Sequence, residues 1–267
     1  MKKLSFATVA AFGSLIATSS FAADMAVKAP PVVAPTCVWC GWYIGANAGW
    51  VGSAGGNFSN TGTDTGGGGL GTVLAAGALP GSVSNSVNGF IGGGQVGYNW
   101  QTGNWLVGLE ADFDGVSAKS TTTVVFPGVP FVPFTTTYAH QLDWLSTVRG
   151  RVGVLASPNF LLYATGGLAI GEVKTGNAFI CPTCGPPAST EPSTVNTDTT
   201  TRVGGTVGAG AEWMFAPKWS LKAEYLYAEL GRTNSTITYT YGVATSTLTS
   251  SIRNSFNIAR AGVNYHF

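Results

Sequence analysis

The chain carries four cysteines in two close pairs, Cys37-Val-Trp-Cys40 and Cys181-Pro-Thr-Cys184. Two CxxC pairs that meet in space supply the four thiolates of a structural zinc site. In an oxidising compartment the simpler outcome is a local disulfide within each pair. A redox-active dithiol enzyme is a third interpretation. The choice among them depends on where the fold places the two pairs.

Histidine and serine are the next source of chemistry. His140 is followed closely by Asp143 and has serines in the segments around it, and His266 is the second histidine of the sequence. A nucleophilic Ser–His pair requires hydrogen-bond geometry, which the spacing of these residues does not predict. We therefore predict no catalytic residues and no enzymatic activity. Lipid A acylation is the activity to assay in a His140→Ala variant.

Residues 92–97 (GGGQVG) match the GxGxxG dinucleotide-binding pattern. That pattern binds a pyrophosphate only when a helix begins directly after it. Here Tyr98-Asn99-Trp100 continue an alternating, strand-like segment. We interpret the glycines as close-packing positions in a curved sheet, and we predict no cofactor.

The N-terminal region indicates the compartment in which these residues must act. Met1-Lys2-Lys3, a short apolar run and small residues near Ala22 form the pattern of a secretory signal peptide over residues 1–22. No later run of about 18 apolar residues predicts a transmembrane helix. Only 9% of the residues are charged, against about 25% in average soluble domains. The net charge of +1 gives no indication of nucleic-acid binding.

A membrane β-barrel reconciles export with low charge, because half of each strand faces lipid. A Pro-rich stretch at residues 23–41 reads as a periplasmic leader. Eight segments that alternate apolar and polar residues follow it: residues 42–51, 90–101, 105–115, 143–155, 160–173, 202–215, 219–230 and 256–267.

Very short turns alternate with long polar connections at residues 52–89, 116–142, 174–201 and 231–254. This regular alternation of short and long connections is typical of periplasmic turns and extracellular loops. Open sheet edges cannot lie in lipid, so the strands must close on themselves. The sequence predicts an all-β fold over residues 42–267: an eight-stranded antiparallel transmembrane β-barrel with short periplasmic turns and four long extracellular loops.

The last predicted strand has an apolar face that ends in Tyr265 and Phe267. It resembles the closing strand of bacterial outer-membrane barrels, which is the signal read by the barrel-assembly machinery. We therefore expect an integral protein of the bacterial outer membrane, surrounded by membrane lipid and lipopolysaccharide.

This topology bears on the cysteines. Cys37 and Cys40 precede the first strand on the periplasmic side, whereas Cys181 and Cys184 fall in the third outer connection. About 25 Å of apolar band separates the two sides. A zinc site shared by all four is excluded if the topology holds, so we predict no metal. We favour two local disulfides over free thiols.

Alternation directs nine charged residues into the lumen. An eight-stranded barrel is just wide enough for its own side chains to fill it, and buried ions are tolerated when they are paired. We favour a salt-bridge network that plugs the lumen over a narrow polar pore whose charges select solutes. The nine residues are Glu110, Asp112, Asp114, Arg149, Arg151, Glu212, Lys222, Glu224 and Arg260.

Residues 124–134 (VVFPGVPFVPF) are unusually apolar for an outer loop. We favour local packing onto the barrel mouth. The alternative is a binding surface for a partner or for a ligand such as haem.

Several motifs carry a resemblance to a known family. They are residues 23–31 (ADMAVKAPP), 41–45 (GWYIG), 97–101 (GYNWQ), 107–112 (VGLEAD), 223–225 (AEY) and 263–267 (VNYHF). With them, the chain resembles the small alphaproteobacterial outer-membrane immunogenic proteins, whose barrels are similar to the transmembrane domain of OmpA. The cysteine pairs look like additions to the family pattern.

The resemblance implies a surface-exposed protein that supports envelope integrity and host interaction, with haem binding or porin activity in some members. Our first hypothesis is therefore a structural barrel whose extracellular loops contact a host or environmental ligand. The alternative is a small porin or a haem-binding outer-membrane receptor.

Overall fold

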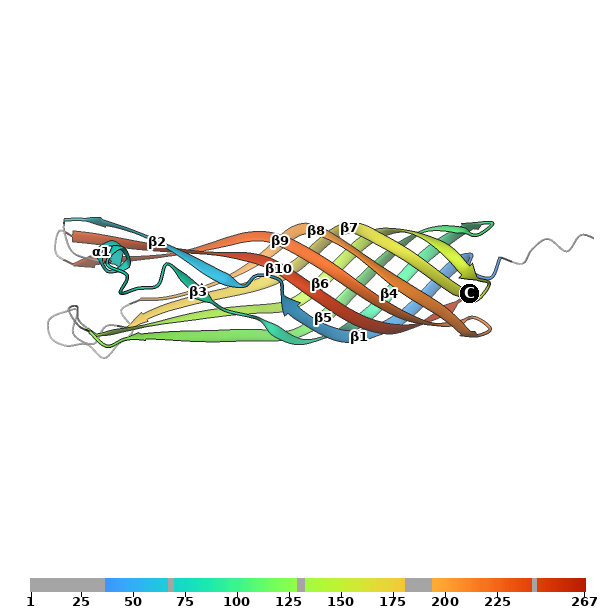
Figure 1. The fold of residues 1–267 in the computed structure, drawn as a ribbon, viewed down its shortest axis with the longest axis horizontal. Helices are drawn as coiled ribbons and strands as arrows, with labels where there is room; N and C mark the ends of the chain where they lie inside the picture. The colour runs from blue at the N-terminus through green and yellow to red at the C-terminus, as the bar shows by residue number, and fades with distance from the viewer. Residues whose placement is uncertain (1–36, 67–69, 129–132, 181–193, 242–243) are drawn as a thin grey trace, which may run out of the picture. The chain divides into compact units, whose positions relative to one another are not determined.

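The computed structural model describes residues 37–66, 70–128, 133–180, 194–241 and 244–267. These residues form ten β-strands in one antiparallel sheet and one short helix, α1 (Leu70–Ala75) (Figure 1). No helix in this part of the chain is long and apolar enough to cross a membrane. The strands are β1 (Gly41–Ser53), β2 (Asn57–Thr65), β3 (Ser82–Ser84), β4 (Asn88–Thr102), β5 (Trp105–Phe126), β6 (Phe134–Ser157), β7 (Phe160–Ile180), β8 (Thr194–Ala216), β9 (Trp219–Tyr241) and β10 (Ala244–His266).

Eight of the described strands close into a ring. Neighbours follow the order β1-β4-β5-β6-β7-β8-β9-β10, and β1 pairs back onto β10 from Tyr43↔His266 to Ser53↔Phe256. The amide of Phe267 also donates to the carbonyl of Trp42 at 3.0 Å. Lipid cannot form hydrogen bonds with the backbone amides at an open sheet edge. Closing the ring pairs these amides with each other, and so the strands form a barrel wall.

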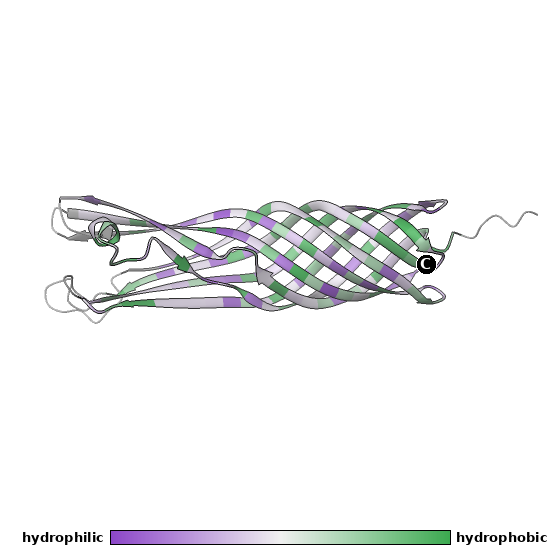
Figure 2. Cartoon of the chain, in the orientation of Figure 1, coloured by the Kyte–Doolittle hydropathy of each residue, from purple (hydrophilic) through white to green (hydrophobic). Residues whose placement is uncertain are grey.

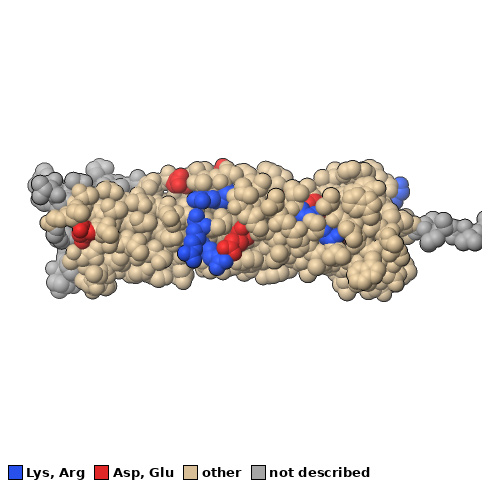
Figure 3. Space-filling view, turned by 90° about the horizontal axis from the view of Figure 1, so that it is seen from above, with Lys and Arg blue, Asp and Glu red and all other residues tan. Residues whose placement is uncertain are grey.

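The outer face of the ring is apolar. Along the strands of the ring, exposed apolar residues alternate with buried residues. Figure 2 shows hydrophobic and hydrophilic residues following one another along these strands. Figure 3 shows that most of one face carries neither acidic nor basic side chains. Aromatic side chains lie near the short turns, the position of an interfacial girdle. They are Trp42, Trp100, Trp105, Trp213, Phe215, Trp219, Tyr265 and Phe267.

The strands are longer than the sequence analysis predicted, so most of the four long loops were assigned wrongly. β5 and β6 pair as far as Phe126↔Phe134, and β9 and β10 as far as Tyr241↔Ala244. The first predicted loop also contains β2, α1 and β3. These segments are rich in Thr and Ser, a composition that was interpreted as loop. Threonine is β-branched and favours strands.

Beyond the ring, the extended strands form a crown of two sheets. The last β8–β9 pair within the described residues is Gly205↔Glu229, and β4 begins only at Asn88↔Lys119. Past these points, β5-β6-β7-β8 form one sheet and β9-β10-β2-β3 form the other. The two sheets separate visibly in Figure 1. Tyr138 bridges them, because its hydroxyl accepts a hydrogen bond from Asn60 Nδ2 at 3.0 Å.

Candidate functional site in the barrel lumen

Strand alternation sets the charged residues of the lumen. Along β5, Glu110, Asp112 and Asp114 are buried because they alternate with the lipid-exposed Leu109 and Phe113. Strand register then sets acids opposite bases, and such cross-strand pairs stabilise a sheet. The three opposite-charge pairs are Glu110↔Arg149, Glu212↔Lys222 and Glu224↔Arg260.

Arg149 and Arg260 join these pairs across the lumen. Arg149, on β6, donates to Asp112 Oδ2 at 2.9 Å and to Glu224 Oε1 at 2.8 Å. Arg260, on β10, donates to the same Asp112 at 2.7 Å and to Glu224 Oε2 at 3.0 Å. It also donates to Asp114 at 2.6 Å. Two strands separate β6 from β9, and two separate β10 from β5, by the shorter way around the ring, so the bonds from Arg149 to Glu224 and from Arg260 to Asp112 and Asp114 cross the lumen between strands that are not neighbours.

Glu110 is the acceptor for three further groups. Lys222 Nζ lies 2.8 and 2.9 Å from its two carboxylate oxygens, and Arg149 bonds the first of them. The hydroxyl of Tyr43 donates to the second at 2.7 Å. Because Tyr43 lies on β1, this bond adds a sixth strand to the cluster, after β5, β6, β8, β9 and β10.

Arg151 forms the periplasmic side of the cluster. It donates to Glu212 Oε2 at 3.1 Å and to Asn99 Oδ1 at 2.9 Å. Its guanidinium lies 4.7 Å from the ring centroid of Tyr43 and 5.3 Å from that of Tyr163, which are cation–π distances. The two tyrosines were not among the predicted lumen residues. Tyr43 was detectable, because it falls on the face of its strand that turns away from lipid.

The structure therefore brings all nine predicted lumen residues together, each less than 6% exposed. Every one of the five carboxylates contacts an Arg or Lys side chain. These ion pairs join strands of the wall to one another inside the lumen.

Trp39 closes the periplasmic end below the charged cluster. Its side chain is fully buried, and its indole Nε1 donates to the carbonyl of Pro158 at 3.0 Å. The ring meets His266 edge-on, with 5.7 Å between centroids. The Cys37–Cys40 disulfide flanks Trp39 on both sides in the chain. Leu106, Leu161, Tyr163 and Met214 complete the apolar contact.

An aliphatic layer closes the lumen on the other side of the charged cluster. Ile258 precedes Arg260 on the inward face of β10, and Leu226 follows Glu224 on that of β9. This layer was not predicted from the sequence, although the same alternation directs these residues inward. The layer consists of Val51, Val87, Ile91, Ala118, Leu142, Leu145, Ala169, Val173, Leu226, Ala228, Leu230, Phe256 and Ile258.

Both histidines are buried in the described structure. His140 lies in the crown, 1% exposed, with Nε2 3.0 Å from Asn254 Oδ1. Burial lowers its pKa to about 4, although the hydrogen bond with Asn254 raises it. Asp143 turns outward at a bulge between Leu142 and Trp144 and contacts Lys174 instead. His266 contacts Ser220 Oγ at 3.0 Å inside the periplasmic end.

The remaining sequence motifs have structural roles. Residues 92–97 lie within β4, where a Cβ on Gly97 would come within 2.2 Å of the Tyr43 ring, so this glycine makes room for the tyrosine. At the tip of the crown, Phe134 packs between Phe126 and Phe179 at centroid distances of 5.1 and 5.5 Å. Cys181 and Cys184 lie outside the described residues.

These features define an integral β-barrel of the outer membrane: a closed antiparallel ring with an apolar outer wall, aromatic girdle residues and a lumen filled by its own side chains.

Comparison with known proteins gives the family. The model of the outer membrane protein beta-barrel domain matches residues 13–267, and the chain belongs to this family. It is 37% identical to the 31 kDa outer-membrane immunogenic protein of Brucella melitensis over 273 residues, which cover 100% of both chains. It is 34% identical to the 22 kDa outer membrane protein of Rhizobium leguminosarum bv. viciae over 139 residues, 51% of this chain and 52% of that one. The predicted family resemblance and outer-membrane location are confirmed.

Among solved structures, the chain is similar to the outer membrane protein OprG of Pseudomonas aeruginosa. The TM-score is 0.43 at 11% identity, with 85% of this chain and 97% of that chain covered. The attachment invasion locus protein Ail of Yersinia pestis gives a TM-score of 0.33 at 13% identity, covering 84% and 99% of the two chains.

Proposed function

We propose that this protein is a sealed barrel that supports the integrity of the outer membrane and uses its crown for contacts with a host or with the environment. The observation that carries the proposal is the filled lumen. From the periplasmic end outward, the Trp39 cluster, the nine-residue charged cluster and the aliphatic layer occupy it in turn. A conducting path would have to displace all three layers.

Cross-wall bonding supports the envelope role. The ion pairs of Arg149 with Glu224 and of Arg260 with Asp112 connect strands of the ring that are not neighbours. They therefore oppose flattening of the barrel as well as separation of neighbouring strands. A stiff, closed wall is what a structural barrel requires. A solute channel does not require a wall braced across its lumen.

The first experiment is single-channel recording of the purified protein in planar bilayers. We expect no conductance steps. Large, stable conductance steps from pure protein would contradict the sealed barrel and favour the porin alternative. Haem titration tests the receptor alternative in the same preparation.

A crown-trimmed variant separates the two parts of the proposed function. Lys119 and Gln141 already pair directly across β5 and β6. Replacing residues 120–140 by an Asn-Gly turn therefore shortens this hairpin without changing the ring. In a strain lacking the protein, the trimmed variant should restore detergent resistance as well as the wild type does, while losing the surface contact. Failure of the wild type itself to restore resistance would refute the envelope role.

Processing and assembly complete the proposal. Residues 1–22 are the signal peptide, residues 23–41 the periplasmic leader and residues 42–267 the barrel, and the barrel-assembly machinery reads Tyr265 and Phe267. Deleting Phe267 should lower the fraction of heat-modifiable, folded protein in outer-membrane preparations. The matched control is Phe90→Ala, which removes another lipid-exposed aromatic away from the terminus.

A further inference from the structure

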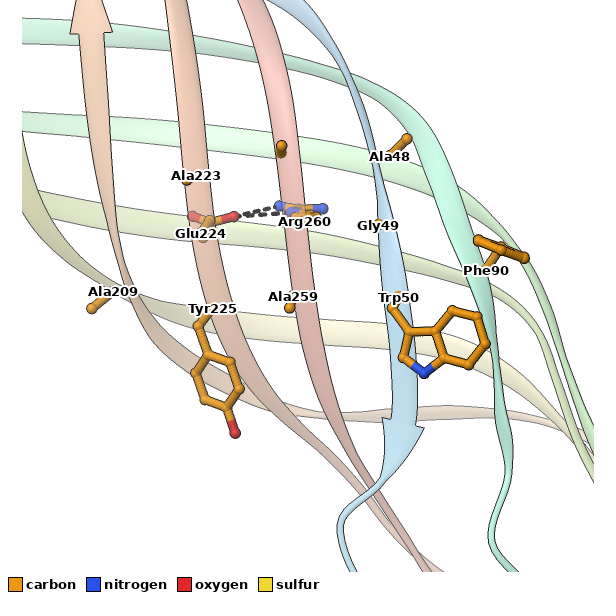
Figure 4. Close-up of a pocket in the computed structure, with 11 residues that line it drawn as sticks. Ala48, Gly49, Trp50, Phe90, Ala209, Ala223, Glu224, Tyr225, Ala259 and Arg260 are labelled. Atoms are coloured by element: carbon orange, nitrogen blue, oxygen red, sulfur yellow. Dashed lines mark hydrogen bonds and ion pairs between the residues drawn. The ribbon is translucent and has the colours of Figure 1, made fainter.

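The lipid-facing wall has a shallow groove of 820 Å³ across β1, β10, β9 and β8. Its floor is made of alanines that pair directly across strands, Ala48↔Ala261 and Ala261↔Ala223. Trp50 and Phe90 border it on one side and Tyr225 on the other (Figure 4). The groove is therefore an apolar depression with aromatic edges inside the apolar band.

Two arginines lie on the same outer face further toward the crown. Arg232 on β9 and Arg253 on β10 are directly paired and both face outward. Like charges in this arrangement destabilise a sheet unless an anion lies between them. Glu229 supplies one carboxylate, and both of its oxygens bond Arg253, at 2.7 and 2.5 Å. Glu229 also interacts electrostatically with Arg232, but the arginine to which it is hydrogen-bonded is Arg253.

The spacing of the two features fits one lipid molecule. Arg253 and Ala259 are six residues apart on β10, about 20 Å along the strand at about 3.3 Å per residue. With barrel strands tilted by about 40°, the separation along the membrane normal is about 15 Å. This places the arginines at the headgroup level when the groove lies among the acyl chains. Figure 3 shows basic side chains gathered in one band on one face of the molecule, with acidic side chains beside them.

We propose that β9 and β10 hold one molecule of lipid A, the phosphorylated glycolipid part of lipopolysaccharide. A lipid A phosphate lies between Arg232 and Arg253, because guanidinium groups bond phosphate oxygens in a bidentate manner. One acyl chain lies in the alanine groove. A second copy of the barrel is disfavoured as the occupant, since Trp50, Phe90 and Tyr225 are 47, 71 and 52% exposed and protrude beside the groove. This site is independent of the proposed function of the crown.

The test is native mass spectrometry of the barrel refolded in a neutral detergent and titrated with lipid A. We expect one lipid per barrel. Arg232→Gln should weaken binding about tenfold, equivalent to about 1.4 kcal/mol. The matched control is Lys119→Gln, which removes an outward basic residue on β5 and should leave the affinity unchanged. Every variant is first checked for heat-modifiable migration.

The groove has its own pair of variants. Ala261→Leu fills the depression and should weaken both lipid A and its dephosphorylated form. Ala111→Leu, on the lipid-facing side of β5, should affect neither. Four results would each overturn the proposal: equal affinity for dephosphorylated lipid A, an equal loss in Lys119→Gln, displacement of lipid A by phosphatidylglycerol at equal concentration, or two barrels per particle.

Discussion

Replacing Arg149 by leucine tests whether the lumen is sealed. The Arg149 side chain is fully buried and pairs with Glu110, Asp112 and Glu224, which are themselves buried. The nine-residue cluster holds four cations and five carboxylates, a net charge of 4 − 5 = −1. The substitution changes this to −2 and leaves carboxylates with fewer partners. Removing one partner from a buried ion pair costs about 3–5 kcal/mol.

The measurement is the free energy of unfolding in urea for the barrel folded into lipid vesicles, followed by tryptophan fluorescence and extrapolated linearly. Arg253→Gln provides the contrast, because Arg253 also pairs with a carboxylate but is 51% exposed. Exposed pairs contribute about 0–1 kcal/mol. We therefore expect Arg149→Leu to lose several times as much stability as Arg253→Gln.

A second substitution separates charge from packing. Arg149→Leu combined with Glu224→Gln restores the net charge of −1, and a glutamine can still accept a hydrogen bond from Arg260. The double variant should recover stability, with a coupling of about 0.5–3 kcal/mol. If Arg149→Leu unfolds within about 1 kcal/mol of the wild type, the cluster is hydrated rather than desolvated, and the argument for a sealed lumen fails.

Three further predictions follow from the ends of the barrel. The pKa of His140 in the folded state, about 4, lies below the ordinary 6.5. Between these values the unfolded chain binds more protons than the folded one, so crown stability should fall as the pH drops from about 6.5 to about 4. An NMR titration of His140 with a midpoint near 6.5 would contradict its burial. Burial raises the pKa of Asp64, but hydrogen bonds from the Gly71 amide, Ser246 and Thr72 lower it further, to about 2. Its stabilisation of α1 is therefore complete above about pH 4 and should be lost as the pH falls through about 2, and Asp64→Asn should abolish this transition in hydrogen exchange of α1. Trp39→Ala removes a fully buried indole, at a cost of about 3–5 kcal/mol, and should make the segment before β1 sensitive to protease, whereas Trp42→Ala, at an exposed position, should not.

Alternation alone was sufficient to predict the barrel ring and the inward acids and bases, because a period of two fixes the face of each residue. The partners of each residue could not be predicted in this way. They depend on register: a one-residue slip between β9 and β10 would move Arg260 away from Glu224 and onto the other face. The crown strands were not predicted because Ser and Thr occupy both of their faces. Such a sequence shows no alternation of apolar and polar residues, and its polarity is that of a loop. Trp39 carries no periodic signal at all, since the segment that inserts it lies outside the strands.

The lumen gives part of the glycine content of the chain a physical explanation. Glycine is abundant, at 38 residues. The cluster requires glycine at some positions, since the long side chains of β5, β6, β9 and β10 can cross the lumen only if other strands leave space. A Cβ on Gly210 of β8 would lie 2.5 Å from the Tyr163 hydroxyl, and one on Gly97 of β4 would lie 2.2 Å from the Tyr43 ring. Both tyrosines bond carboxylates of the cluster. Gly97→Ala should therefore displace Tyr43 from Glu110 and destabilise the barrel without changing any charge. Gly94→Ala should be tolerated, because the added Cβ would lie 3.8 Å from the carbonyl oxygen of Gly45, an ordinary van der Waals contact.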